Sequence, residues 1–251
     1  MILILKIILV NIGINPLKTI QFVRGLPSFI ITAWKFFKAK KNEKIIFFPI
    51  LGEQFEKSGN LTKHYFYMDH LVAQQVINNA PKMHYDLGSR VDGFVSHIAL
   101  HTIVEILDVR PININLDNIV SRVGIAEALP YENESISSFS MLHVFEHFGL
   151  GRYGDPFNLS AHISASKEVT RVMKQDGIFY FATPVTKEDT ICFNAHRIFN
   201  PDTIINLFSE FELIKSICID DNENIHHEDA VSKMKEQKYG CGIFIFRKIS
   251  R

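Results

Sequence analysis

The segment that most constrains this chain is Met83–Gly93, which reads MHYDLGSRVDG. An apolar approach ends at Asp86, Gly88 and Ser89 follow at once, and Gly93 precedes a second apolar run. A strand that ends at an acidic residue, turns on glycine and enters a helix brings its backbone close to a ligand. The segment therefore predicts the ligand-binding turn of an α/β domain.

Strands and helices alternate after this turn. Apolar runs predict strands at Met83–Asp86, Ile103–Asp108, Ser137–His143, Gly177–Thr183, Phe211–Ile219 and Gly242–Arg247, with a further strand within Asn113–Asn118 and Val123–Ala126. Helical spacing predicts helices at Asn60–Asn79, Val91–His101, Asn158–Lys174 and Pro201–Phe208. Strands separated by helices predict a mostly parallel, doubly wound sheet. The polar stretch Asp220–Lys238 is expected to be a solvated loop with a short helix, whose His226, His227 and Glu228 form no metal site.

Residues 1–60 are predicted to form an apolar, helical appendage, and residues 61–251 the α/β domain. Breaks are expected at Pro16, Gly25–Pro27 and Pro49–Gly52. The apolar start of the chain lacks a basic segment and a cleavage site, and Pro16 follows too soon for a bilayer span.

Two interpretations of this appendage stay open. Met1–Ile14 either packs on the main domain as a buried strand or helix, or belongs to an anchor at a membrane surface. The anchor is favoured by aromatic side chains among lysines, a mixture typical of interfacial helices. These residues are Trp34, Phe36 and Phe37 with Lys35, Lys38, Lys40, Lys41 and Lys44.

Composition limits the classes of binding partner and the cellular compartment that we expect. Hydrophobic residues make up 47% of the chain, enough for a sizeable core. Basic and acidic residues balance at 27 each, so the net charge gives no indication of nucleic-acid binding. Cys192, Cys218 and Cys241 form no disulfide framework, which is typical of a reducing compartment. We therefore expect a cytoplasmic protein that does not bind nucleic acid, peripheral to a membrane if its appendage binds one.

The glycine turn differs from the GxGxxG of dinucleotide-binding enzymes. Arg90 stands where the second glycine lets a pyrophosphate approach the backbone, so a ligand without a diphosphate fits better. Asp108 lies 22 positions after Asp86, at the end of the next predicted strand. An acidic residue at this point can accept both hydroxyls of a ribose. The pattern therefore predicts an adenosyl ligand.

The segments DLGS, LDVRP, AEALPYENESI, LHVFEH and RVMKQDG, in this order, resemble the class I S-adenosylmethionine-dependent methyltransferases. This resemblance implies a seven-stranded, Rossmann-like methyltransferase fold, with S-adenosylmethionine as cofactor and S-adenosylhomocysteine as product. The chain also resembles, more narrowly, a little-characterised bacterial family, a domain of unknown function found in surface-polysaccharide loci. The motifs of that family correspond to His64–Asp69, Asp86–Phe94 (with GSRxDGF), Glu146–Pro156 (EHFGLGRYGDP) and Phe193–Arg197 (FNAHR).

The resemblance implies a set of cofactor-binding residues. They are Asp86, Gly88, Ser89 and Arg90 for the methionine part, Asp108 for the ribose, Val109, Ala126 and Glu127 for adenine, and His143 beside the cofactor. Two positions depart from the methyltransferase pattern. Ile125 stands where many of these enzymes have an Asp that binds the adenine amine, and Ser137 where the fourth strand commonly begins with Asp. The first departure puts adenine recognition in question.

The segment from His143 to Pro156 follows the fourth strand, at the edge where α/β sheets bind ligands. Its HVFEH sequence matches the HxxEH zinc motif of one protease class, but that motif needs a helix where a strand end is predicted, so we expect no metal. Arg152, Tyr153 and Asp155 offer an anion clamp, a hydroxyl and a carboxylate to a substrate. The alternative is a rigid loop in which Arg152 pairs with Asp155.

A second polar loop, Phe193–Arg197, follows the fifth strand and would also close over the acceptor. His196 is a candidate general base, because a neutral imidazole can remove a proton near pH 7. Arg197 is a candidate ligand for a phosphate or carboxylate. The alternative is a role at the cap of the next helix, where Asn200 precedes Pro201.

Together these patterns give two sets of acceptor-side residues. The predicted catalytic residues are His196, His143, Tyr153 and Asp155, and the predicted substrate-binding residues are Glu146, His147, Arg152, Tyr153, Asn194 and Arg197. Asp69 and His70 either belong to a pocket rim or, more simply, are solvated.

The sequence thus predicts methyl transfer to oxygen, less readily nitrogen, of a small polar anionic acceptor. A sugar, a sugar phosphate or a capsule or lipopolysaccharide precursor would fit. The alternative is a non-catalytic methyltransferase-like scaffold or binding protein in surface-polysaccharide assembly, which Ile125 and the missing second glycine favour. A third interpretation, an NAD-dependent sugar enzyme, is disfavoured because the turn lacks the second glycine that binds a diphosphate. The oligomeric state stays open.

Overall fold

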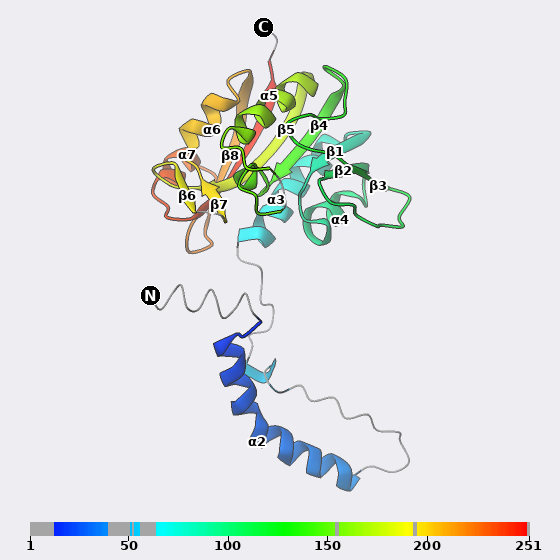
Figure 1. Ribbon diagram of the computed structural model, residues 1–251, viewed down its shortest axis with the longest axis vertical. Helices are drawn as coiled ribbons and strands as arrows, with labels where there is room; N and C mark the ends of the chain where they lie inside the picture. The colour runs from blue at the N-terminus through cyan, green and yellow to red at the C-terminus, as the bar shows by residue number, and fades with distance from the viewer. Residues whose placement is uncertain are drawn as a thin grey trace. The chain divides into compact units, whose positions relative to one another are not determined.

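The computed structural model describes residues 13–39, 51, 53–55, 64–153, 156–192 and 195–249. The chain forms two compact units, Met1–Leu61 and Thr62–Arg251, each of which is described by itself (Figure 1). The described part of the first unit contains helix α2 (Pro16–Ala39) and the 3-10 turn η1 (Glu53–Phe55). Within the described ranges, no helix is both long and apolar enough to cross a bilayer.

Helix α2 starts at a predicted boundary but continues through a predicted break. The side chain of Asn15 accepts hydrogen bonds from two backbone amides of the first turn, and Pro16 occupies the first helical position. The break expected at Gly25–Pro27 is wrong, because the helix includes Pro27. Gly25 serves packing instead, since a Cβ there would lie 2.1 Å from the carbonyl oxygen of Leu51. Residues 1–12, 40–50 and 52, which carry other predictions for this unit, lie outside the described residues.

An eight-stranded sheet organises the second unit, in the order β3-β2-β1-β4-β5-β10-β8-β9. Its strands are β1 (Met83–Leu87), β2 (Ile103–Asp108), β3 (Ile119–Val123), β4 (Ile136–Leu142), β5 (Met173–Val185), β8 (Phe211–Ile219), β9 (Ile225–His226) and β10 (Gly240–Lys248). The strands from β1 to β5 run parallel, and β10 lies antiparallel between β5 and β8. This confirms the mostly parallel α/β sheet, and the strand beyond the predicted seven is the two-residue β9. The short strands β6 (Thr190–Cys192) and β7 (His196–Ile198) pair separately.

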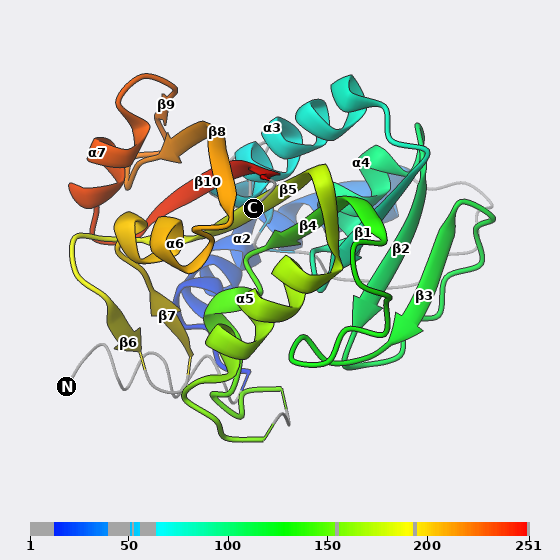
Figure 2. The ribbon, with the colours of Figure 1, turned by 90° about the horizontal axis from the view of Figure 1, so that it is seen from above.

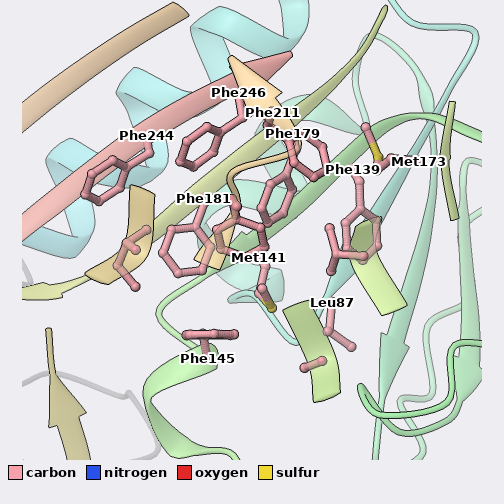
Figure 3. Close-up of a cluster of buried hydrophobic side chains, with 14 of the residues drawn as sticks. Leu87, Phe139, Met141, Phe145, Met173, Phe179, Phe181, Phe211, Phe244 and Phe246 are labelled. Carbon is pink, nitrogen blue, oxygen red and sulfur yellow. The ribbon is translucent and has the colours of Figure 1, made fainter. Parts of the chain in front are cut away.

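Helices cover both faces of the sheet (Figure 2). On one face α3 (His64–Asn79), the wide turn η2 (Val91–Val95) and α4 (Ser96–Ile98) bury an aliphatic cluster. On the other face α5 (Ala161–Val172), α6 (Pro201–Leu207) and α7 (Ala230–Lys235) cover a phenylalanine-rich cluster. Figure 3 shows this cluster, to which Phe145 of the 3-10 turn η3 (Phe145–His147) contributes directly after β4. The two cores hold the strand ends, and the turn that follows β4, in fixed positions.

Some predicted elements differ from the structure. The strand after β2 is Ile119–Val123, and Ile114 of the predicted segment Asn113–Asn118 instead packs on the aliphatic cluster from a loop. The predicted helix Val91–His101 is the turn η2 followed by α4, which ends at Ile98. Helix α5 stops at Val172, and the chain enters β5 directly.

Asp69 of α3 is buried, contrary to the expectation of a solvated position, whereas His70 is exposed. The Asp69 carboxylate lies against the backbone of η2, where a Cβ on Gly93 would come within 2.0 Å of its Oδ2. Among the described residues its Oδ1 has no hydrogen-bond partner. Burial raises the pKa of Asp69 to about 6, although Arg90 and His143 oppose the rise.

Asp69→Asn should stabilise the chain in a pH-dependent way. Because the pKa of Asp69 is raised in the folded state, the folded chain binds the proton of this carboxyl more tightly than the unfolded chain does. The unaltered chain therefore loses stability as the pH rises and Asp69 ionises, up to a pH of about 6. The variant should therefore gain up to about 3 kcal/mol near pH 8 and little near pH 4, as measured by urea unfolding. Asp92→Asn is the control, since Asp92 is exposed and hydrogen bonds from Arg90 lower its pKa. An equal gain of Asp69→Asn at both pH values would contradict the prediction.

Candidate functional site

A crevice opens at the carboxyl ends of β1, β2 and β4. The strand order reverses between β1 and β4, and α/β sheets bind ligands at such a reversal. Two adjoining cavities form the crevice, a larger one of about 790 Å³ and a smaller one of about 570 Å³. Both are lined by Gly88, Asp108, Arg110, His143, His147 and Tyr153, so they make one continuous site.

The buried carboxylate of Asp86 fixes the turn after β1. One of its oxygens accepts the backbone N–H of Ser89 at 2.9 Å, and the other accepts the hydroxyl of Ser140 on β4. Burial raises the pKa of Asp86 to about 6, and these hydrogen bonds oppose the rise. Gly88 has a φ of +67°, and a Cβ there would lie 2.7 Å from the side chain of Val144. The position requires glycine, whose backbone reaches both cavities.

His84, which sequence reasoning missed, lies behind this carboxylate. Its two ring nitrogens contact the hydroxyls of Ser138 and Ser140 at 2.7 and 2.8 Å. Burial lowers the pKa of His84 to about 3, so the ring is neutral and uses one nitrogen as donor and one as acceptor. The period of two in a strand was the available signal, because it places His84 and Asp86 on the same face. The hydrogen bonds from His84 to Ser140 and from Ser140 to Asp86 therefore orient the Asp86 carboxylate.

Asp108 ends β2 at the junction of the two cavities. Its Oδ1 accepts the backbone N–H of Arg110 at 2.9 Å and the Nε–H at 3.1 Å, and its Oδ2 accepts the terminal guanidinium nitrogen at 3.2 Å. The guanidinium also lies over the ring of Tyr153, 5.0 Å from its centroid. Arg110 was not predicted as a site residue. A ribose that reached Asp108 would therefore compete with Arg110 for both carboxylate oxygens.

A buried ion pair follows β4. His143 has a φ of +54°, and its Nδ1 donates to Oε1 of Glu146 at 2.9 Å, with both side chains 1% exposed. Its Nε2 lies 3.3 Å from the sulfur of Cys241 on β10. Burial opposes the charged ring, but Glu146 and Cys241 together outweigh burial and raise the pKa of His143 to about 10. His143 is therefore an imidazolium, and the pKa of Glu146 is lowered in turn because His143 outweighs the effect of burial.

The loops after β4 and β6 are joined at one carbonyl group. Ala195 O accepts hydrogen bonds from His147 Nδ1 at 2.8 Å and from Arg152 at 2.9 Å. Arg152 also lies over the ring of Tyr153, 5.2 Å from its centroid, so Tyr153 contacts two guanidinium groups. These contacts hold His147 and Tyr153 at the junction of the two cavities.

His196 and Arg197, neighbours in the predicted acceptor-side loop, have different surroundings. His196 is half-buried and lines the larger cavity, with its ring 5.1 Å from Tyr239 and 6.3 Å from His147 between centroids. Arg197 is 4% exposed and donates to the carbonyl oxygens of Phe148 and Leu159, and it lines neither cavity. Asn200 caps α6 by accepting the backbone N–H of Asp202. Arg197 thus supports the loop after β4 from outside the crevice.

The structure brings most of the predicted site residues to the crevice. The larger cavity is lined by Ser89, Arg90, His143, His147, Arg152, Tyr153 and His196, and the smaller by Val109, Ala126, Glu127, His143, His147 and Tyr153. Asp155 and Asn194 lie outside the described residues. Tyr65 and Tyr239, which were not predicted, complete the larger cavity. Tyr65 lies inside the motif at His64–Asp69, so that motif was the signal for it.

Comparisons with known proteins give a family and a fold. The family described as a Caenorhabditis protein of unknown function, DUF268, matches residues 111–249. No curated protein matches the chain.

Several solved structures share the architecture of the second unit. N-methyltransferase NodS from Bradyrhizobium japonicum, in complex with S-adenosyl-L-homocysteine, is 10% identical over 75% of this chain and 90% of its own, with a TM-score of 0.53. The 1,6-didemethyltoxoflavin-N1-methyltransferase of Burkholderia thailandensis is 10% identical over 73% and 77%, with a TM-score of 0.52. The cyclase SpnF is 13% identical over 74% and 81%, with a TM-score of 0.54. These similarities show the Rossmann-like fold of methyltransferases.

Proposed function

This chain belongs to the family described as a Caenorhabditis protein of unknown function, DUF268, and we propose that it is an S-adenosylmethionine-dependent methyltransferase. The observation that carries the proposal is the pairing of the Gly88 turn with Asp108 in one crevice at the strand reversal. A backbone that approaches a ligand closely, followed by an acid for ribose, suits an adenosyl group.

The donor set around the crevice fits this cofactor. Asp108 would hold the ribose, and the Asp86–Ser89 turn would bound the methionine part, with Arg90 near its carboxylate. The smaller cavity has an apolar wall suited to adenine, formed by Leu87, Leu107, Val109, Ala126 and Val144. When bound, the cofactor supplies an electrophilic methyl group on a sulfonium.

Adenine recognition differs from the usual methyltransferase pattern. Ile125, at the position of the usual Asp, is 50% exposed and lines the smaller cavity. Glu127 also lines the smaller cavity and carries a carboxylate that is not assigned to the ribose. We assign Glu127 to the adenine amine, because a carboxylate is a strong acceptor for such a donor.

The larger cavity would receive the acceptor. Tyr65, Tyr153 and Tyr239 give it aromatic walls, and Arg90 and Arg152 give it positive charge. This combination supports a polar, anionic acceptor. We propose a sugar, a sugar phosphate or a capsule or lipopolysaccharide precursor, methylated on oxygen and less readily on nitrogen. Arg197 adds nothing to this charge, since it donates to backbone carbonyls outside the cavity. The chain's residues would align the acceptor and remove its proton.

A second candidate is a non-catalytic methyltransferase-like binding protein in surface-polysaccharide assembly. Two observations favour it: Arg110 occupies both oxygens of Asp108, and Ile125 offers no acid to adenine. A fold of this type also hosts a protein titled as a cyclase, so the fold does not decide the reaction. Binding of the cofactor is what separates the two candidates.

Calorimetry with S-adenosylmethionine and S-adenosylhomocysteine tests the proposal. Both ligands should bind. Asp108→Ala should weaken the binding of S-adenosylhomocysteine by about tenfold or more, because hydrogen bonds between the ribose and a charged group are lost. Arg110→Ala is the matched variant and should strengthen binding, since it frees the same carboxylate. Absence of binding of either ligand by the unaltered chain would exclude the cofactor. Weakened binding by Arg110→Ala would exclude the competition between Arg110 and the ribose.

The N-terminal unit suggests a peripheral membrane location on the cytoplasmic side. Helix α2 contains Lys18, Arg24, Lys35 and Lys38, and the first acidic residue of the sequence is Glu43. Lys38 lies 3.6 Å from the centroid of the Trp34 ring. Large apolar side chains of α2 are exposed, namely Leu17, Ile20, Phe22, Val23, Leu26, Ile30, Ile31, Trp34 and Phe36. Apolar surface with positive charge suits an anionic lipid surface.

Vesicle sedimentation tests this location. The full chain should sediment with phosphatidylcholine vesicles that contain phosphatidylserine more than with phosphatidylcholine alone. The double variant Lys35→Gln and Lys38→Gln should bind the anionic vesicles about 30-fold more weakly, because each basic residue near such a surface contributes about 1 kcal/mol. Lys233→Gln with Lys235→Gln, on α7, is the control and should leave binding unchanged. Equal sedimentation with both kinds of vesicle would contradict the charge contribution.

A further inference from the structure

Three histidines lie around the carboxylate of Glu146, and their contacts differ. His143 makes the buried ion pair described above, His147 has its Nε2 3.8 Å from Glu146 Oε1, and the ring of His196 lies tilted against that of Tyr239. If the chain transfers a methyl group to a hydroxyl, one group in the crevice must take the proton. The contacts of His143 and His147 show which of their ring nitrogens is free to do so, and position in the crevice separates His147 from His196.

His143 has no nitrogen free for this purpose. Its Nδ1 donates to the carboxylate of Glu146 and its Nε2 contacts Cys241, and the side chain is 1% exposed. As an imidazolium it already carries both protons. Its role is to hold Glu146 in place at the end of β4.

His147 presents a free nitrogen. Its Nδ1 lies 2.8 Å from the backbone oxygen of Ala195, and Arg152 Nη1 lies farther from Nδ1, at 3.5 Å, because it donates to the same oxygen at 2.9 Å. A carbonyl oxygen only accepts, so the proton of the neutral ring is on Nδ1 and the lone pair is on Nε2. Burial lowers the pKa of His147, although Glu146 opposes this effect, so the ring is neutral near pH 7.

His147 is also in the right place. It lines both cavities, whereas His196 lines only the larger one. A methyl group passing from a cofactor at the Gly88 turn to an acceptor among the tyrosines would cross the junction at which His147 lies. Glu146 Oε1 stands 3.8 Å from Nε2, where its charge stabilises the ring once that nitrogen is protonated.

We propose that Nε2 of His147, rather than the ring of His196, is the base that deprotonates the acceptor hydroxyl. The inference rests on the proposed methyltransferase function. The O–H bond of the acceptor breaks as its proton bonds to Nε2. An electron pair of that oxygen forms the new bond to the methyl carbon, and the electrons of the broken carbon–sulfur bond stay on sulfur. Glu146 faces the imidazolium that results.

The first test reads the ring nitrogens without any acceptor. Nitrogen-15 NMR of the full chain near pH 7 should show His147 protonated at Nδ1 only, with and without S-adenosylhomocysteine. His147→Asn identifies the signals by their loss, and its amide can keep the hydrogen bond to Ala195 O. A proton on Nε2 of His147, or on both nitrogens, would overturn the assignment.

The second test separates binding from turnover. His147→Asn and His196→Asn should both bind S-adenosylhomocysteine within about threefold of the unaltered chain, a difference below about 1 kcal/mol. Transfer of labelled methyl from S-adenosylmethionine to a panel of monosaccharides and monosaccharide phosphates should fall about 100-fold or more in His147→Asn and much less in His196→Asn. The reverse order would assign the base to His196 and overturn the proposal. If the unaltered chain methylates no panel member, the NMR result alone decides.

The two tests also distinguish failure of this inference from failure of the proposed function. If S-adenosylhomocysteine binds but His147 is doubly protonated, the assignment of His147 as the base is overturned and the methyltransferase proposal stays intact. Absence of cofactor binding by the unaltered chain would overturn both.

Discussion

The buried carboxylate of Asp86 is the constraint on which the rest of the site depends. A carboxylate inside a sheet is stable only when its oxygens are hydrogen-bonded, and here the partners are the Ser89 amide and the Ser140 hydroxyl. Ser140 belongs to β4, so this contact joins β1 to β4 at the point where the strand order reverses. The carboxylate therefore shapes the glycine turn and also fixes it against the neighbouring strand.

A second buried charge organises the other wall of the crevice. The ion pair of His143 and Glu146 follows β4 directly, and Phe145 between them anchors η3 in the phenylalanine-rich core. From this fixed point His147 and Arg152 reach Ala195 O, while Arg197 reaches Phe148 O in the opposite direction. The loops after β4 and β6 thus support each other. Loss of Arg197 would disturb the site through the backbone rather than through a substrate contact.

Function in this fold has to be argued from side chains at the crevice. Proteins with the same architecture include two titled as methyltransferases and one titled as a cyclase, so the sheet alone does not select a reaction. What distinguishes this chain is a set of local contacts: His147 Nδ1 against Ala195 O, His143 paired with Glu146, and Asp108 held by Arg110. Each contact has a different chemical consequence.

Sequence alone determined the features that depend on neighbours along the chain. The strands that carry Asp86 and Asp108 near their carboxyl ends, the glycine turn, the Asn200 cap and the parallel α/β order all follow from local patterns of apolar, acidic and glycine residues. Tertiary structure decided the features that depend on distant partners. Asp69 is buried because α3 packs on η2, and Arg197 donates a hydrogen bond to a backbone carbonyl group in the loop after β4. Likewise, Ala195, 48 positions from His147, decides which nitrogen of that ring carries the proton. Burial and hydrogen-bond partners are set by which strand ends meet, and no local pattern of residues contains that information.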